Sequence, residues 1–191
     1  MESAEAALDR LCDGEFEVSA HYLVGRDGTV FRMVCEDKRA WHAGAGSWAG
    51  RGDVNSRSIG IELDNDGTSQ FTEPLMVSLE VLLADILHRH GLPPRAVIGH
   101  SDMAPGRKSD PGRHFDWRRL SEKGLSVWPA HLSGGDFMRD AAAFGYPVDV
   151  GESAILSAFR QRFNPNASGC LSKDDEALMA GLARGFPAEI A

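Results

Sequence analysis

Residues 99–112 read GHSDMAPGRKSDPG, which places an imidazole, a carboxylate and an ammonium in one short segment. The residues just before it, 95–98, are predicted to form a short buried strand. Two prolines and three glycines within 99–112 exclude a continuous helix, so His100 and Asp110 can meet only if the segment folds back on itself. Closing a loop of about ten residues costs little entropy, so such a return of the chain is inexpensive.

His and Asp are both common zinc ligands, and a catalytic zinc site takes three protein ligands and keeps one position for water. His100 and Asp110 would supply two of the three. On these residues alone a simpler interpretation stays open, in which His100 ends a strand and is capped or solvated by the polar residues that follow.

The length, composition and charge of the chain limit how many domains it can form and which partners it can bind. A chain of 191 residues with 42% hydrophobic residues forms either one large domain or a main domain of about 130 residues with an appendage. The net charge of −8 argues against nucleic acid as a partner, because phosphate binding needs a basic surface. A local basic cluster predicts either an anionic ligand or a solvated face, and comprises Arg107, Lys108, Arg113, Arg118 and Arg119.

The cysteines and the apolar runs suggest no disulfide framework and no membrane span. Cys12, Cys35 and Cys170 are far apart and odd in number, so neither a disulfide framework nor a metal knuckle is predicted. The longest apolar runs are too short to cross a bilayer, and the first residues do not resemble a signal peptide. We therefore expect a cytoplasmic location, with the periplasm as the alternative, and the sequence indicates no particular oligomeric state.

Periodicity upstream of residue 99 predicts helices around a central sheet. Strands are expected at 18–24 and 29–34, joined by a turn in which Asp27-Gly28 supplies the positive φ that a hairpin needs. Apolar residues on both faces of the first strand indicate a sheet that is covered on both sides. The other expected elements are a helix at 3–12, a strand at 58–63 and a helix at 75–90. Together these elements predict an α/β fold.

Glu62 stands inside a hydrophobic strand, between Ile61 and Leu63. Burying a carboxylate at such a position is costly unless the group is paired or used in chemistry. The two interpretations are a rim position that reaches solvent and a catalytic carboxylate.

The segment 99–112 resembles the zinc loop of the N-acetylmuramoyl-L-alanine amidases of type 2. This bacterial family shares its fold with phage amidases and peptidoglycan recognition proteins. The matching positions are Gly99, His100, Ser101, Asp102, Ala104, Pro105, Arg107, Lys108, Asp110, Pro111 and Gly112. Residues 19–24, 40–44 and 55–62 also resemble blocks of the family, in the family's order. The resemblance implies a mixed central β-sheet flanked by helices.

The resemblance also implies an activity and the residues that carry it. A member would be a zinc-dependent hydrolase of the amide bond between N-acetylmuramic acid and L-alanine in peptidoglycan or muropeptides. Carried over position by position, His100 and Asp110 are zinc ligands, Glu62 is the acid/base carboxylate and Lys108 is the cation beside the reacting carbonyl. An amide is a poor electrophile with a poor leaving group, so these roles suit its hydrolysis at neutral pH. The residues expected to bind substrate are Trp41, His42, Asn55 and Arg107, whereas His21 is expected to be structural.

The start of the chain leaves an alternative function open. In the family the third zinc ligand is a His just before the first helix, and no residue precedes Met1 here. We expect either that the natural protein is longer or that this is a truncated form with impaired metal binding. The alternative function is therefore a non-catalytic protein that binds peptidoglycan or muropeptides.

The end of the chain changes composition at the predicted linker 132–135, which divides the chain into an amidase domain at 1–130 and a small module at 131–191. Three short helices are expected there, at 136–144, 152–163 and 173–182. Their sequence resembles the helical peptidoglycan-binding module that follows some of these amidases, through residues 145–147, 158–163, Pro165 and Gly169. The alternative is that these helices simply extend the core.

Overall fold

The computed structural model describes residues 18–188, so the helix predicted at 3–12 lies outside the described part of the chain. Contacts divide the chain into two compact units. The first comprises the residues up to 45 together with 53–92, and the second comprises 46–52 together with the residues from 93 onward. Across residues 18–188, no helix is both long enough and apolar enough to cross a membrane.

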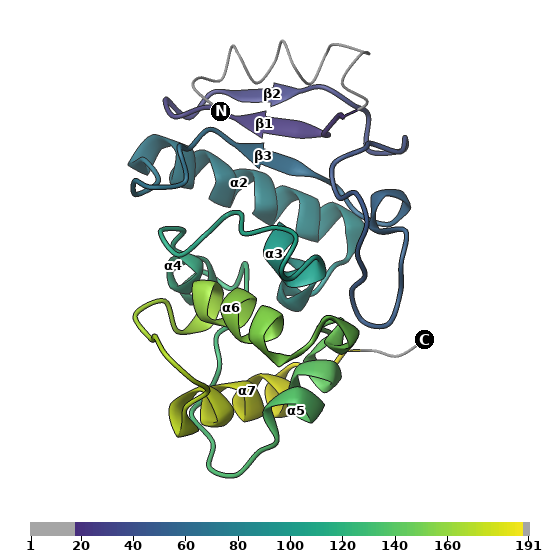
Figure 1. The fold of residues 1–191 in the computed structure, drawn as a ribbon. Helices are drawn as coiled ribbons and strands as arrows, with labels where there is room; N and C mark the ends of the chain where they lie inside the picture. The colour runs from purple at the N-terminus through teal and green to yellow at the C-terminus, as the bar shows by residue number, and fades with distance from the viewer. Residues whose placement is uncertain (1–17, 189–191) are drawn as a thin grey trace. The chain divides into compact units, whose positions relative to one another are not determined.

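The first unit contains a three-stranded mixed sheet in the order β2-β1-β3 (Figure 1). Strand β1 (Tyr22–Val24) pairs antiparallel with β2 (Val30–Arg32) and parallel with β3 (Ile61–Leu63). The predicted hairpin and the predicted third strand are confirmed, although each strand is shorter than expected. The turn closes where Gly25 N donates to Thr29 O at 2.8 Å, with Gly28 at a φ of 87°.

Helix α2 (Glu73–His90) completes the first unit and packs against β1. Pro74 in its first turn suits a helix start, and Gly91 ends the helix in the left-handed conformation with a φ of 61°. The helix predicted at 75–90 is confirmed. Its buried stripe follows helical spacing and consists of Leu75, Met76, Leu79, Leu83, Ile86 and Leu87.

The prediction of a buried strand at residues 95–98 is wrong. The chain forms the short 3-10 helix η3 (Pro94–Ala96), and Val97 after it is extended but belongs to no strand. Pro93 and Pro94 are the physical reason: a proline fixes φ near −65° and lacks an N–H, which suits the first position of a helical turn. Val97 and Ile98 are half-buried.

The second unit is helical in its described part. Its first helices are α3 (His100–Met103) and α4 (Trp117–Glu122). The three helices predicted near the end of the chain are confirmed as α5 (Phe137–Phe144), α6 (Glu152–Phe163) and α7 (Lys173–Gly185), with the short 3-10 helix η4 (Val148–Val150) between α5 and α6. Asp136 and Ser172 cap α5 and α7 by accepting hydrogen bonds from the first-turn amides.

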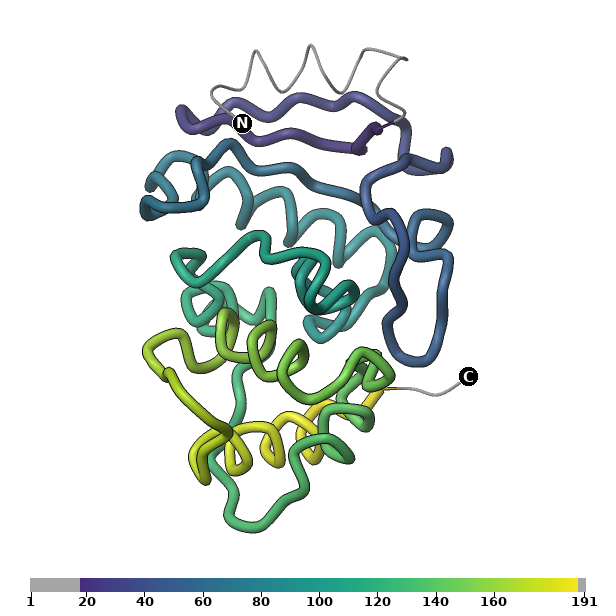
Figure 2. The backbone as a smooth tube through the Cα atoms, in the orientation of Figure 1, coloured from purple at the N-terminus to yellow at the C-terminus, as the bar shows by residue number. Residues whose placement is uncertain are grey.

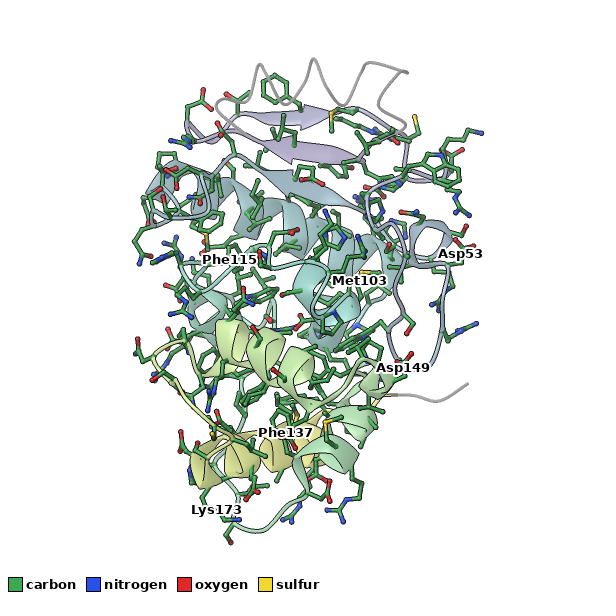
Figure 3. The ribbon with its side chains drawn as sticks, viewed as in Figure 1. Asp53, Met103, Phe115, Phe137, Asp149 and Lys173 are labelled. Atoms are coloured by element: carbon green, nitrogen blue, oxygen red, sulfur yellow. The ribbon has the colours of Figure 1, made fainter. Side chains whose placement is uncertain are left out.

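The core of the second unit lies among α5, α6 and α7. Phe137, labelled in Figure 3, and Phe159 meet there edge to face at 5.5 Å between ring centroids. Val127, which precedes the predicted linker, belongs to the same core. Residues on both sides of position 130 therefore share one core, and the predicted boundary between 1–130 and 131–191 stays a prediction.

Arg160 on α6 and Asp175 on α7 form a buried ion pair within this unit. Arg160 Nη2 lies 2.6 Å from Asp175 Oδ2, and Nε lies 3.1 Å from Oδ1. Burial alone raises the pKa of the Asp175 carboxyl, but hydrogen bonds from Arg160, Ser172 and Asn164 outweigh it and hold the pKa at about 2. The carboxylate is thus favoured in the folded state.

This pair gives the first testable prediction, which concerns acid stability. The pKa of Asp175 is lower in the folded chain than its ordinary value of 3.8, so its stabilisation is present above about pH 4 and is lost as the pH falls towards 2. We expect wild type to lose about 2 kcal/mol more unfolding free energy than Asp175→Asn over that interval. Urea unfolding of both proteins at several pH values measures the difference, and parallel pH curves would contradict the assignment.

Candidate active site

Segment 99–112 forms no continuous helix, as its prolines and glycines predict, and folds back around the four-residue helix α3 that begins at His100. Ser101 N donates to Asp110 O at 2.9 Å, which ties the start of the segment to its end. The side chains follow, because His100 Nδ1 lies 2.9 Å from Asp110 Oδ2. The chain trace through α3 and the loop after it can be followed in Figure 2. The structure therefore confirms that His100 and Asp110 meet.

Gly99 allows this close return of the chain. A Cβ at this position would lie 2.9 Å from Pro111 Cδ and 3.3 Å from Trp117 Cζ2. Only a residue without a side chain leaves room for Pro111, the neighbour of Asp110.

The ionisation of Asp110 suits a ligand. Burial raises the pKa of its carboxyl, but the hydrogen bond with His100 and electrostatic attraction to His100 and Lys108 outweigh burial and lower the pKa below its ordinary value. Metal ligands have to be deprotonated to bind. Asp110 is therefore an anion throughout the neutral range.

The pair of donors fits zinc in chemistry and in separation. Imidazole nitrogen and carboxylate oxygen are usual zinc ligands, and two donors on one zinc ion, each about 2.0 Å from it, lie slightly more than 3 Å apart. The observed 2.9 Å is close to that separation. Within residues 18–188, no third His, Cys, Asp or Glu joins the pair to make a three-residue cluster.

Two cations accompany the pair. Arg107 Nη2 lies 3.5 Å from His100 Nε2, and the charge of Lys108 contributes to the lowered pKa of Asp110. A polar hollow of about 240 Å³ opens beside them. It is lined by Gly106, Arg107, Lys108 and Ser109 of the loop and by Ser157, Ala158 and Gln161 of α6.

Ser157 and Gln161 line the hollow beside Arg107 and Lys108, and sequence reasoning did not point to them. The sequence predicts the helix at 152–163 correctly, and the two residues lie four apart on it, so they share one face. Nothing in helical periodicity says which polar face meets a loop some fifty positions earlier in the chain.

In the first unit, Glu62 occupies the middle of β3. It lies opposite Leu23 of β1, which is fully buried, while Glu62 itself is half-buried. Glu62 is thus fixed by strand pairing without being sealed in the core.

His42 packs against the strand that leads to Glu62. A Cβ on Gly60 would lie 2.3 Å from His42 Cγ, so the imidazole rests directly on the Gly60 backbone. His21 meets His42 edge to face at 5.6 Å. His21 Nδ1 accepts a hydrogen bond from Gly60 N at 2.9 Å, and His21 Nε2 lies 3.1 Å from Lys38 O. With both ring nitrogens used inside the protein, His21 has the structural position predicted for it.

Trp41 and Asn55 have contrasting surroundings. Trp41 is 55% exposed, and the Arg39 guanidinium lies 4.2 Å above its ring. Asn55 is buried, and its Oδ1 accepts hydrogen bonds from the amides of His42 at 3.0 Å and Ala43 at 2.8 Å. Asn55 therefore holds the turn after Trp41, and its predicted contact with substrate stays a prediction.

The predicted site residues form two sets, each assembled within its own unit. His42 and Asn55 meet in the first unit, which also holds Glu62 and Trp41. His100, Arg107, Lys108 and Asp110 gather on one loop of the second unit.

Comparisons with known proteins find amidases that are similar to this chain over residues of both units. Residues 1–113 match the sequence profile of the family described as N-acetylmuramoyl-L-alanine amidase. The chain is 31% identical over 219 residues to the N-acetylmuramoyl-L-alanine amidase AmiD of Escherichia coli K12, covering 95% of this chain and 79% of AmiD. It is 43% identical over 103 residues to the 1,6-anhydro-N-acetylmuramyl-L-alanine amidase AmpD of Citrobacter freundii, covering 54% of this chain and 55% of AmpD.

Two solved structures share the fold. Escherichia coli AmiD, in complex with the substrate anhydro-N-acetylmuramic acid-L-Ala-D-γ-Glu-L-Lys, matches with a TM-score of 0.89 and 28% identity over 98% of this chain and 86% of that one. AmpDh3 of Pseudomonas aeruginosa matches with a TM-score of 0.85 and 30% identity over 96% of this chain and 88% of that one. The predicted mixed sheet flanked by helices is confirmed.

Proposed function

Because the chain belongs to the N-acetylmuramoyl-L-alanine amidase family, it is an amide hydrolase, and we propose that it cleaves the bond between N-acetylmuramic acid and L-alanine in muropeptides. The observation that carries the proposal is the convergence of His100 Nδ1 and Asp110 Oδ2 on one loop beside Lys108. AmiD and AmpD are both named as amidases, and neither favours the alternative of a non-catalytic binding protein.

The proposed cofactor is zinc, with His100 Nδ1 and Asp110 Oδ2 as two of its ligands. A zinc ion held there would acidify water and polarise a carbonyl group. Asp110 is already an anion in the neutral range, so only the His100 nitrogen has to be free of its proton for both donors to bind.

Glu62 is the proposed proton carrier. As water adds to the lactyl carbonyl carbon, the Glu62 carboxylate accepts the proton that the water loses. The proton then passes to the nitrogen of L-alanine as the carbon–nitrogen bond breaks, so that the amine leaves in neutral form. Lys108 would stabilise the negative charge that develops on the carbonyl oxygen.

Four residues are proposed to bind the rest of the substrate. Trp41 offers an exposed indole face to a sugar ring or a peptide. His42 and Asn55, which are joined by a hydrogen bond in the turn after this indole, would contact the substrate beside it. Arg107, beside the polar hollow, would pair with a carboxylate of the stem peptide.

The proposed substrates include both soluble muropeptides and intact peptidoglycan. The similarity to AmpD, named as a 1,6-anhydro-N-acetylmuramyl-L-alanine amidase, supports an anhydromuropeptide substrate and a place in peptidoglycan recycling. The similarity to AmiD covers 95% of the chain and thus includes the C-terminal helices. We propose that residues 131–191 act as a peptidoglycan-binding module when the substrate is the cell wall.

The second prediction tests the activity. The chain, supplied with excess Zn²⁺, is incubated with anhydro-N-acetylmuramic acid-L-Ala-D-γ-Glu-L-Lys, and the products are identified by mass spectrometry. We expect anhydro-N-acetylmuramic acid and the free tripeptide, with no product in the presence of a zinc chelator. Binding of the muropeptide without cleavage would establish the non-catalytic alternative. Cleavage at another bond would refute the proposed specificity.

A further inference from the structure

Asp102 is a buried carboxylate on α3, two residues after His100, and the proposed reaction does not use it. It is 0% exposed and accepts three hydrogen bonds. Oδ2 accepts from Gly99 N at 2.8 Å and from Arg162 Nη1 at 2.5 Å, and Oδ1 accepts from Tyr146 OH at 2.7 Å. Two of these donors, Tyr146 and Arg162, belong to the C-terminal helical region, by which we mean residues 131–188.

Arg162, in the last turn of α6, also contacts other residues around segment 99–112. Its Nη2 donates to Val97 O at 2.9 Å and to Ser126 Oγ at 3.2 Å, and its guanidinium lies 4.1 Å above the Trp117 ring. Its side chain is only 1% exposed. One guanidinium thus bonds residues on both sides of His100, at positions 97 and 102.

The geometry restricts how His100 can move. A buried charged pair becomes strongly unfavourable when one partner is removed, because the other charge is left without compensation. Three hydrogen bonds from different directions also fix the Asp102 carboxylate in position, and Asp102 lies on the same single helical turn as His100. The orientation of His100 towards Asp110 therefore depends on Tyr146 and Arg162.

Helix α6 carries a second buried arginine, Arg160, whose ion pair has no contact with segment 99–112 among the bonds found. Arg160 pairs with Asp175 at 2.6 Å and donates to the carbonyls of Gly169 at 2.7 Å and Cys170 at 2.9 Å. All these partners lie within the C-terminal helical region. The Arg160 pair therefore stabilises the helices without touching the loop that carries His100.

We propose that Arg162 and Tyr146 are positioning residues that hold the zinc-binding loop in place through Asp102. The C-terminal helical region then has a second role besides the proposed binding of peptidoglycan, since it completes the scaffold of the metal site. This inference rests on the proposed function, in which His100 and Asp110 hold the metal.

The third prediction compares Tyr146→Phe and Arg162→Ala with the control Arg160→Ala in the full chain. Three properties are measured: thermal unfolding, Zn²⁺ affinity by calorimetric titration, and amide hydrogen exchange of residues 99–110. Both arginine variants should lower the melting temperature. Of these two arginine variants, only Arg162→Ala should also weaken Zn²⁺ binding and speed amide exchange at residues 99–110. The expected loss of affinity is about 10- to 100-fold, the usual cost of losing a group that orients a metal ligand.

Tyr146→Phe keeps the ring and removes one hydroxyl, so it tests the proposal even if Arg162→Ala does not fold. We expect it to shift Zn²⁺ affinity and loop exchange in the same direction by a smaller factor. Where hydrolysis is measured, kcat should fall with little change in KM. The proposal would be overturned if Tyr146→Phe and every folded Arg162 variant kept the Zn²⁺ affinity and loop exchange of wild type. It would also be overturned if Arg160→Ala changed both properties as much as Arg162→Ala does. Neither affinity nor exchange depends on hydrolysis, so an inactive wild type would refute the proposed function alone.

Discussion

Replacing Glu62 by glutamine is expected to lower kcat by about 10²- to 10⁴-fold, the usual contribution of a general acid–base group. Glutamine has nearly the same size but cannot accept the proton that water loses. Strand β3 pairs with β1 through backbone atoms, so the fold should tolerate the change. Initial rates on the anhydromuropeptide measure the effect, and Zn²⁺ affinity should equal that of wild type.

Asp64 supplies the matched control for this substitution. It lies two residues beyond Glu62, where the side chain of an extended chain points to the same face. Its Oδ1 is 3.3 Å from Arg26 Nε, and the carboxylate is 5% exposed. Asp64→Asn should cost stability and leave kcat unchanged. If Glu62→Gln retained the wild-type kcat, or if Asp64→Asn lost as much, Glu62 would have no special role as proton carrier.

The parts of the fold that the sequence predicts well depend on local chemistry. Asp27-Gly28 specifies a hairpin turn, and Gly91 ends a helix whose apolar stripe recurs at helical spacing. The absence of a continuous helix in segment 99–112 follows from its own prolines and glycines. Each of these signals lies within the element that it specifies, so no tertiary contact is needed to interpret it.

The prediction that failed also concerns local chemistry, at residues 95–98. Apolar content suggested a strand, but Pro93 and Pro94 set the backbone at the start of a helical turn. In a segment this short, the fixed φ of a proline outweighs the preference of two apolar residues for an extended conformation.

The support of the loop could not be predicted, because its partners are distant in sequence. Asp102 accepts hydrogen bonds from residues 44 and 60 positions away. In the sequence Asp102 is one of several polar residues in segment 99–112, and Arg162 is one of two arginines on the helix predicted at 152–163. The hydrogen bonds from the His42 and Ala43 amides to Asn55 Oδ1 could not be predicted either, because they join residues 13 and 12 positions apart. Only tertiary structure separates a buried structural polar group from an exposed functional one.

Replacing Asp110 by alanine is expected to weaken Zn²⁺ binding by more than about 100-fold. Removing an orienting group beyond the ligands already costs up to that factor, and Asp110 is a proposed ligand itself. The loop should keep its path, because Ser101 N bonds to the backbone oxygen of Asp110, which alanine retains. Calorimetric titration measures the affinity, and hydrolysis should fall below detection at Zn²⁺ concentrations that saturate wild type.

Asp116 is the matched control for the metal site, since it lies six residues further along the same unit and its carboxylate has a different task. Asp116 Oδ1 accepts from Arg119 N at 3.0 Å and so caps α4. Asp116→Ala should cost about 1 kcal/mol of stability, as the loss of a helix cap does, and leave Zn²⁺ affinity unchanged. Unchanged affinity in Asp110→Ala would instead show that His100 and Asp110 form only a hydrogen-bonded pair. The ligand assignment would then fail, because one of the two donors assigned to the metal would be dispensable.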